Sequence, residues 1–242
     1  MMIGLLGKKV GMTVIYDEGG TQIPVTLLLA GPCRVLRILK KEKSGYSAVQ
    51  LGFGARKQKN VTQPVLGQFK KLGLPAQAFV REIRTEEVDG LEVGTELGVD
   101  NFEAGEFVDI EGVSIGKGFQ GVVKRHHFTG GNKTHGSMFG RVAGSIGASS
   151  FPSRVVKGMR MPGQMGNHRV TVQNLKVVKV DPENHLLAVK GAVPGSGSGF
   201  VVIRTSLKRG KAKKWKVEQK QELSPEPAKE VVKETVKEGS AS

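Results

Sequence analysis

The chain has 242 residues, 38% of them hydrophobic and 5% aromatic, with 34 glycines, and 37 Lys and Arg against 22 Asp and Glu leave a net charge of +15. The single cysteine, Cys33, lies in a strand-like apolar run, which excludes a disulfide framework or a cysteine-based zinc site and predicts a small buried side chain. No signal cleavage site and no apolar run of 18 residues are visible, so the sequence predicts a soluble, cytoplasmic protein with no membrane partner.

Short β-branched or alternating apolar runs, separated by turn residues, fill the first 112 residues and return after Arg169. This pattern predicts strands over Ile3–Leu6, Met12–Tyr16, Ile23–Ala30, Arg34–Leu39, Ser47–Phe53, Ala78–Ile83, Phe107–Ile110, Val170–Val180, Leu186–Val189 and Phe200–Arg204. Turns are predicted at residues 17–20 and 181–184, and only Val65–Leu72 shows a weak helical pattern. Closure removes the exposed edges of short strands. We therefore predict a mainly β fold in which residues 1–115 and 170–206 form a closed or nearly closed antiparallel barrel.

The central segment of the chain contains no acidic residue. Between Glu111 and Asp181, 69 consecutive positions hold eleven Lys and Arg and no Asp or Glu, so this segment alone contributes +11. The other 26 basic and 22 acidic residues leave only +4 for the rest of the chain. Like charges at this density repel one another unless a polyanion lies beside them, and a nucleic-acid backbone is such a polyanion. The segment is therefore predicted to bind nucleic acid.

Residues 116–169 interrupt the predicted barrel as a glycine-rich insertion. Twelve glycines fall between Gly116 and His168, and the apolar residues there follow neither the strand period nor the helix period for long. A long irregular insertion in a compact domain is either functional or disordered. Scattered Phe, Met and Ile residues are atypical of a solvated linker, so we expect an extension that orders inside a folded nucleic acid.

The last 36 residues differ in composition from the rest. A basic run around Trp215 is followed by a glutamate at every fourth position from Glu218 to Glu238, with two prolines among them. Too few apolar residues are present to bury a face, so residues 207–242 are predicted to form a charged, disordered tail.

The sequence Gly116-Lys-Gly118-Phe-Gln-Gly121 matches the GxGxxG pattern of nucleotide-binding loops. A dinucleotide fold also needs an acidic residue about twenty positions later and alternating strands and helices. A kinase needs further lysine, HRD and DFG motifs. None of these is present, so we interpret the glycines as turns or close approaches to phosphate, and we expect no cofactor.

Histidines and serines of the segment provide the rival hypothesis of a metal-dependent or phosphoryl-transfer enzyme. They are His126, His127, His135 and His168, and Ser145, Ser149, Ser150 and Ser153. Hydrolytic zinc sites normally include a carboxylate, and a nucleophilic serine needs an acidic partner and a strained elbow. The segment supplies neither, so we expect no enzyme, no catalytic residue, no bound metal and no small-molecule substrate.

The distribution of basic residues favours RNA over DNA. They are not gathered on one helix that fits a major groove, and no zinc-finger, homeodomain or basic-zipper pattern is present. They recur along a glycine-rich chain, where arginines can reach phosphates and apolar or imidazole side chains can stack on exposed bases. Candidate RNA-binding residues are Lys117, Lys124, Arg125, His126, Lys133 and His135. A free DNA-binding regulator remains the alternative.

A series of fragments, in order from residue 2 to about residue 204, resembles one known family. The fragments are IGLLGKKVGMT, IPVTLLLAGPC, GYSAVQLGF, GKGFQGVVKRHHF, THGS, GSIG, KGMRMPGQMGN, RVTVQNLKVVKVD and LLAVKGAVPG. Together they resemble the bacterial large-subunit ribosomal protein L3 family, and only the part after Ser206 lies outside the resemblance.

The resemblance implies a six-stranded barrel of the translation-protein type, seated on large-subunit ribosomal RNA. It also implies an internal extension that reaches toward the peptidyl-transferase centre, a role in early subunit assembly, and contacts with neighbouring large-subunit ribosomal proteins. By motif match, the tip of the extension would comprise Gly144, Ser145, Ile146, Gly147 and Ala148, with Ser145 touching RNA. The flanks that face RNA would carry Arg141, Arg154, Lys157, Arg160, Gln164, Asn167, His168 and Arg169.

The chain departs from the family pattern at several positions. His126 and His127 stand where many members have tryptophan and asparagine, so histidine replaces a stacking tryptophan. Ala148 occupies the position of a glutamine that is methylated in some members, and we expect no such modification. Ser153 and Pro162 replace the common glycine and alanine, which changes the expected backbone near the tip.

Overall fold

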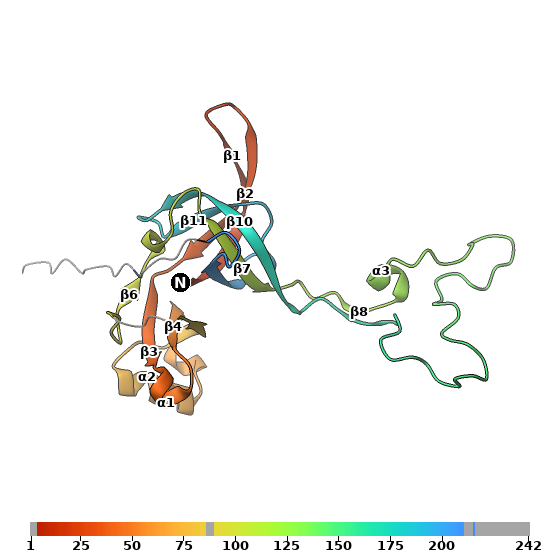
Figure 1. Cartoon of the computed structure of the whole chain (residues 1–242), viewed down its shortest axis with the longest axis horizontal. Helices are drawn as coiled ribbons and strands as arrows, with labels where there is room; N and C mark the ends of the chain where they lie inside the picture. Colours follow the sequence, from red (N-terminus) through yellow and green to blue (C-terminus); the bar gives the residue numbers. More distant parts are fainter. Residues whose placement is uncertain (1–3, 86–89, 211–214, 216–242) are drawn as a thin grey trace, which may run out of the picture.

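A closed barrel forms the centre of the fold. The structure is a computed structural model that describes residues 4–85, 90–210 and 215, so the predicted disordered tail lies almost wholly outside the described residues. Six antiparallel strands close the barrel in the order β1-β12-β7-β10-β11-β2 (Figure 1). They are β1 Gly4–Tyr16, β2 Gln22–Ala30, β7 Phe107–Val113, β10 Arg169–Asp181, β11 Leu186–Lys190 and β12 Phe200–Thr205. The predicted mainly β fold with a closed barrel, and the six strands implied by the family resemblance, are confirmed.

A second antiparallel sheet packs beside the barrel. Its order is β5-β4-β3-β6, with β3 Cys33–Leu39, β4 Ala48–Ala55, β5 Gln77–Arg84 and β6 Glu96–Leu97. Three of the predicted strands therefore lie in this sheet, outside the closed barrel. Alternation within a strand reports which side chains are buried but not which strand lies next to it.

Short helical elements connect the strands of the second sheet. The helix predicted at Val65–Leu72 is α2, Gln63–Leu72, with Pro64 in its first turn and Gly73 in the left-handed conformation at its end. The sequence pattern missed α1 Lys41–Ser44 and the 3₁₀ turns Gln58–Asn60 and Val99–Asn101. One turn is too short to show a helical period.

The first two predicted strands are one continuous strand in the structure. Glycine and lysine between them suggested a break, but β1 continues from Gly4 to Tyr16 and absorbs the irregularity as a bulge between Lys9 and Gly11. Both predicted turns are present. The Gly20 N–H donates to the Asp17 carbonyl at 2.8 Å, and the Asn184 amide donates to the Asp181 carboxylate at 2.9 Å.

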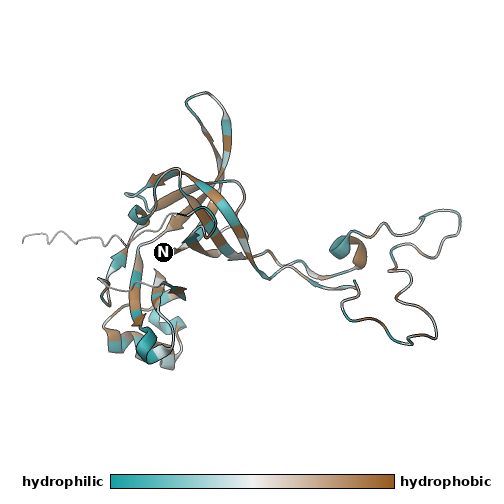
Figure 2. Ribbon diagram, in the orientation of Figure 1, coloured by the Kyte–Doolittle hydropathy of each residue, from teal (hydrophilic) through white to brown (hydrophobic). Residues whose placement is uncertain are grey.

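One hydrophobic core joins the barrel to the second sheet. It contains Leu5, Leu28 and Ile203 from the barrel together with Leu51 and Ile83 from the second sheet, all completely buried. Figure 2 shows hydrophobic residues on the strands of both sheets. Because burial of apolar area is the main favourable term in folding, the two sheets stabilise each other as one unit.

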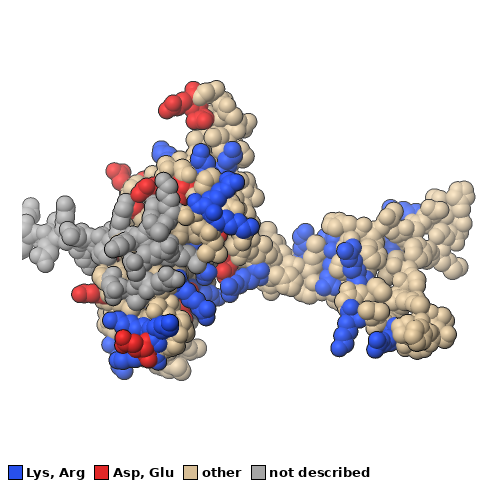
Figure 3. All heavy atoms as spheres, in the orientation of Figure 1, with Lys and Arg blue, Asp and Glu red and all other residues tan. Residues whose placement is uncertain are grey.

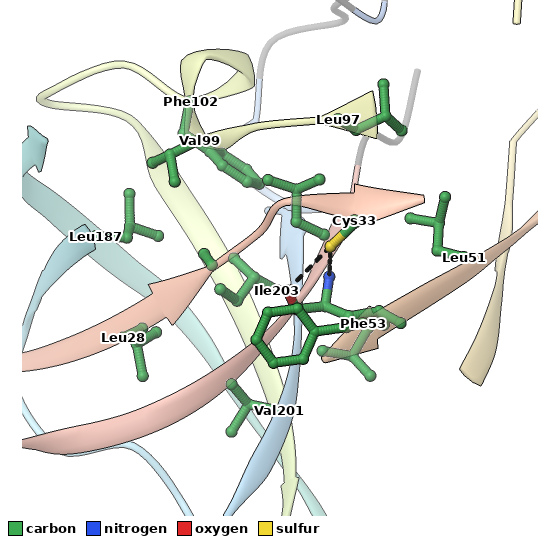
Figure 4. Close-up of a cluster of buried hydrophobic side chains, with 14 of the residues drawn as sticks. Leu28, Cys33, Leu51, Phe53, Leu97, Val99, Phe102, Leu187, Val201 and Ile203 are labelled. Carbon is green, nitrogen blue, oxygen red and sulfur yellow. Dashed lines mark hydrogen bonds between the residues drawn. The ribbon is translucent and has the colours of Figure 1, made fainter. Parts of the chain in front are cut away.

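Cys33 lies inside this core, as predicted, at the start of β3, where the chain passes from the barrel to the second sheet (Figure 4). The Leu6 N–H donates to Sγ at 3.3 Å, and the thiol donates to the Leu6 carbonyl at 3.2 Å. Burial raises the pKa of the Cys33 thiol from 9.0 to about 12, and the hydrogen bond from Leu6 offsets only part of this rise.

Two arms leave the compact part of the molecule (Figure 1). One is the far end of the β1–β2 hairpin, and the other is the long extension between β7 and β10. No helix in the described part of the chain has both the length and the apolar character needed to cross a bilayer.

The buried thiol gives the first prediction. In the native protein at pH 8, Cys33 should react with a thiol reagent at least about a hundredfold more slowly than after unfolding, because the neutral, buried form is unreactive. A folded-state pKa above the unfolded value means that native protein holds the proton more tightly. The contribution of Cys33 to stability is therefore complete below pH 9 and falls as the pH rises toward 12. Equal labelling rates of native and unfolded protein would contradict the buried position.

Candidate nucleic-acid interface

The extension begins as a narrow stem that continues two strands of the barrel. The N–H of Ser114 donates to the His168 carbonyl at 2.8 Å, and further along the Lys117 N–H donates to the Met165 carbonyl at 2.9 Å. Strand β8, Gly118–Gln120, then pairs with β9, Gly163–Met165. The strands β7 and β10 thus anchor the stem. The sequence did not predict the short ribbon β8–β9, because the apolar residues there follow no regular period.

Gly166 shows how closely the two chains of the stem approach. Its φ is +72°, and a Cβ atom there would lie 2.1 Å from the carbonyl oxygen of Ile115. Only glycine combines this backbone conformation with so close an approach. The sequence predicts turns or close approaches to phosphate for the glycines at 116, 118 and 121, whereas at Gly166 the close approach is to protein backbone.

Helix α3, Val122–His126, ties the outgoing chain to the returning chain. The Arg125 guanidinium donates to the Met161 carbonyl at 2.6 Å, and His126 Nε2 lies 3.1 Å from the same oxygen. Gly163 leaves room for the guanidinium, since a Cβ there would lie 2.7 Å from Arg125 Nη1. Two predicted RNA-binding residues therefore also hold the extension together, and both are partly buried.

Phe139 organises a small loop beyond α3. The Gly131 N–H donates to the Gly140 carbonyl at 2.7 Å, and the Phe139 ring lies over Gly131, where a Cβ would come within 2.3 Å of the ring. A Cβ atom at Gly144, the first predicted tip residue, would lie 3.4 Å from the same ring. Sequence analysis missed this role of Phe139, although the glycine pair at 130–131 was a visible signal of close packing.

Basic side chains of the extension remain exposed after these contacts are made. Figure 3 shows Lys and Arg along the extension with no acidic residue among them. The exposed predicted residues are Lys117, Lys124, Lys133, His135, Arg141, Ser145, Arg154, Lys157, Arg160, Gln164, Asn167, His168 and Arg169. Within the described residues, only Arg169 of this group forms an ion pair, with Glu111 at 2.6 Å, and its side chain is still 73% exposed.

Apolar side chains of the extension are exposed as well. Met138, Phe151 and Phe119 are 98%, 88% and 75% exposed, and the predicted tip residues Ile146 and Ala148 are also exposed. A surface that combines unpaired cations with uncovered aromatic and aliphatic groups suits a folded RNA, which offers phosphates and base faces together.

A cleft of about 460 Å³ lies at the base of the stem. Phe79 and Phe200 line it, their rings stacked 4.9 Å apart and nearly parallel, and the Arg81 guanidinium lies 4.9 Å from the centre of the Phe79 ring. Arg169 lines the same cleft. Aromatic rings and arginines are groups on which bases stack, so this cleft extends the candidate interface onto the barrel and β5 of the second sheet.

Sequence analysis also missed a second basic surface. Residues 34–84 contain twelve Lys and Arg but only two acids, a charge of +10. Ten acids and no Lys or Arg follow over residues 85–111, so the whole-chain sum concealed this block. Eleven of the twelve basic residues are exposed, and Arg34 is the partly covered one, paired with Glu96 at 2.7 Å. A sliding count of charge would have found this surface on the second sheet and its helices.

Metal binding receives no support from the described part of the chain, where no three His, Cys, Asp or Glu side chains come together as ligands would. The four histidines of the segment are spread along it. His135 has a left-handed backbone, and His168 lies on the stem, where its N–H lies 3.2 Å from Ser114 Oγ.

Comparisons with known proteins agree with this geometry. A family model described as Ribosomal protein L3 matches residues 89–186, which include the whole extension. The chain is 48% identical over 213 residues to the large ribosomal subunit protein uL3 of Brachyspira hyodysenteriae, covering 88% of this chain and 98% of that protein. It is 54% identical over 209 residues to uL3 of Syntrophotalea carbinolica, covering 86% of this chain and all of that protein. The uL3 of Geobacter sulfurreducens is 50% identical over 208 residues, covering 86% and 99%.

The hydrogen bond from Arg125 to the Met161 carbonyl clamps the outgoing chain of the extension to the returning chain, and it gives the second prediction. Arg125→Ala should speed amide hydrogen exchange at residues 117–120 and 163–165 of the free protein, because the guanidinium no longer holds the Met161 carbonyl. Exchange in the barrel strands should not change. Lys124→Ala is the matched control, since Lys124 lies on the same helix but is exposed. Equal exchange in both variants, measured by mass spectrometry, would rule out the clamp.

Proposed function

Because this chain belongs to the ribosomal protein L3 family, we propose that it is a structural constituent of the large ribosomal subunit, acts in translation in the cytoplasm, and binds large-subunit ribosomal RNA directly. The observation that carries the proposal is the acid-free extension, whose basic side chains are exposed and, apart from Arg169, form no ion pair within the described residues. The family is structural, and the proposal assigns this chain no catalytic step and no cofactor.

Neutralisation of phosphate charge is the proposed source of affinity. Each Lys or Arg that meets a phosphate releases condensed counterions, which favours binding and makes it depend on salt. An acidic residue on the extension would face phosphate and oppose this gain. A segment that contacts RNA phosphates should therefore lack acidic residues, and this one has none over 69 positions.

We propose that the exposed apolar side chains make the surface of the extension complementary to the RNA. Phe119, Met138 and Phe151 would lose contact with water when they pack on unstacked bases. The long stem supports entry of the extension into the RNA, away from the barrel (Figure 1). We propose that the tip at residues 144–148 approaches the peptidyl-transferase centre, as the family resemblance implies.

A second contact with RNA is proposed on the second sheet. The basic residues of segment 34–84 lie on the second sheet and its helices, and those of the extension lie along the projecting arm (Figure 3). The two regions adjoin at the cleft that Arg81 and Arg169 line. The barrel and its shared core connect them rigidly. A protein that joins two RNA segments in this way suits an early role in subunit assembly, beside neighbouring ribosomal proteins.

The third prediction concerns the extension. Arg154→Gln and Arg160→Gln should each weaken binding of the full chain to large-subunit RNA, because each removes one phosphate contact. The slope of log affinity against log salt should fall by about 0.7–0.9 for each lost contact. Filter binding at several salt concentrations measures both quantities.

Lys190→Gln is the matched control for charge, because Lys190 is exposed but lies outside both basic regions. Its salt slope should equal that of the unmodified protein. A salt-independent affinity, or equally tight binding to duplex DNA in the presence of competitor ribosomal RNA, would overturn the proposal.

The fourth prediction concerns the second surface. Replacing Lys70 and Lys71 together by glutamine should lower the salt slope by about 1.4–1.8, as expected if both lysines at the end of α2 meet phosphates. Thermal unfolding of the variant checks that the helix is intact, since basic residues in a last turn stabilise helices by about 0.3–1 kcal/mol. An unchanged slope in a folded variant would remove this surface from the interface.

A further inference from the structure

The far end of the β1–β2 hairpin differs in charge from every other projecting part of the molecule. No Lys or Arg occurs from Val10 to Cys33, 24 residues of a chain that has 37 of them, while Asp17 and Glu18 lie in the hairpin turn. Figure 3 shows acidic side chains at the end of this arm. An RNA backbone would be repelled there, because no cation lies beside the two carboxylates.

One face of the arm is apolar although it is exposed. Val10, Met12, Val14 and Tyr16 are 55%, 55%, 38% and 69% exposed. Residues 12, 14 and 16 alternate with Thr13 and Ile15 and therefore share one face of β1, and Pro24, paired with Val14, extends that face onto β2. Antiparallel sheets normally carry polar residues on the solvent side. This arm carries hydrophobic ones, which indicates a covered surface.

Pairing along the arm supports the same conclusion. β1 pairs with β12 only as far as Lys8, and β2 pairs with β11 only from Val25 to Leu29. Among the described strands, Val14–Tyr16 and Gln22–Pro24 therefore pair only with each other. A two-stranded ribbon is marginally stable by itself in water, so contact with a partner would stabilise it.

We propose that this hairpin face binds a neighbouring protein of the large subunit whose contact surface places apolar side chains beside Lys or Arg. The apolar stripe at residues 12, 14 and 16 would bury against the apolar groups, and Asp17 and Glu18 would meet the basic ones. This inference rests on the proposed function for the identity of the particle, but on different residues from those that contact RNA.

Site-specific photocrosslinking in purified large subunits tests the inference. The full chain carries benzoylphenylalanine in place of Tyr16, or in place of Thr13 as the matched control on the opposite face of the same strand. A third chain carries it in place of Phe151, 88% exposed on the extension. Mass spectrometry identifies crosslinked protein, and nuclease sensitivity identifies crosslinked RNA.

We expect position 16 to crosslink to one basic ribosomal protein with a yield at least about fivefold above that of position 13. Glu18→Lys in the position 16 chain should reduce that yield roughly fivefold, because like charges then face each other, while Glu18→Gln should reduce it less. A crosslink from position 16 to RNA or to a second copy of the chain, no crosslink, or equal yields from both faces would overturn the inference.

Position 151 separates the two proposals in the same particles. RNA crosslinks from position 151 together with none from position 16 would reject the hairpin surface alone. Absence of RNA crosslinks from position 151 would instead count against the proposed function.

Discussion

Repulsion among the basic side chains of the extension is the constraint on which the rest of the structure depends. With no acid between Glu111 and Asp181, the segment cannot form ion pairs within itself. It is held instead by hydrogen bonds between its two chains, by the clamp of Arg125 on the Met161 carbonyl, and by the strands β7 and β10 that anchor its base. These contacts fix the backbone of the extension without neutralising its basic side chains. Its positive charge therefore stays available to an external polyanion.

Charge divides the molecule into surfaces that suit different partners. The extension and segment 34–84 are strongly basic, and the acids that balance segment 34–84 follow it in the sequence as a separate block, residues 85–111. The hairpin arm lacks cations and exposes apolar groups. A single core shared by both sheets links these surfaces, so the barrel acts as a rigid hub that fixes their separation.

Much of the β structure was predictable because burial imposes a two-residue period on each strand. The strands from Ile23 to Ala30 and from Leu186 to Val189 were found within a residue or two of their ends. Continuity of β1 was not predictable, since the bulge near Lys9 looks like a break when its partner strand is unknown. The sequence also did not show that Arg34–Leu39 belongs to a second sheet, because its partner strands are unknown before the chain folds.

By itself, the sequence determined the charge of the extension, its glycine-rich composition and the turns of the hairpins, because composition and local periodicity are properties of neighbouring residues. From the same charge it predicted a polyanion as the partner. Only the tertiary structure decided what individual side chains do. Arg125 and His126, which the sequence predicts to bind RNA, also meet the Met161 carbonyl, and Arg169 also meets Glu111. Contacts of this kind join residues that are 35 to 58 positions apart in the chain. They exist only once the backbone has brought those residues together, and no local pattern records them.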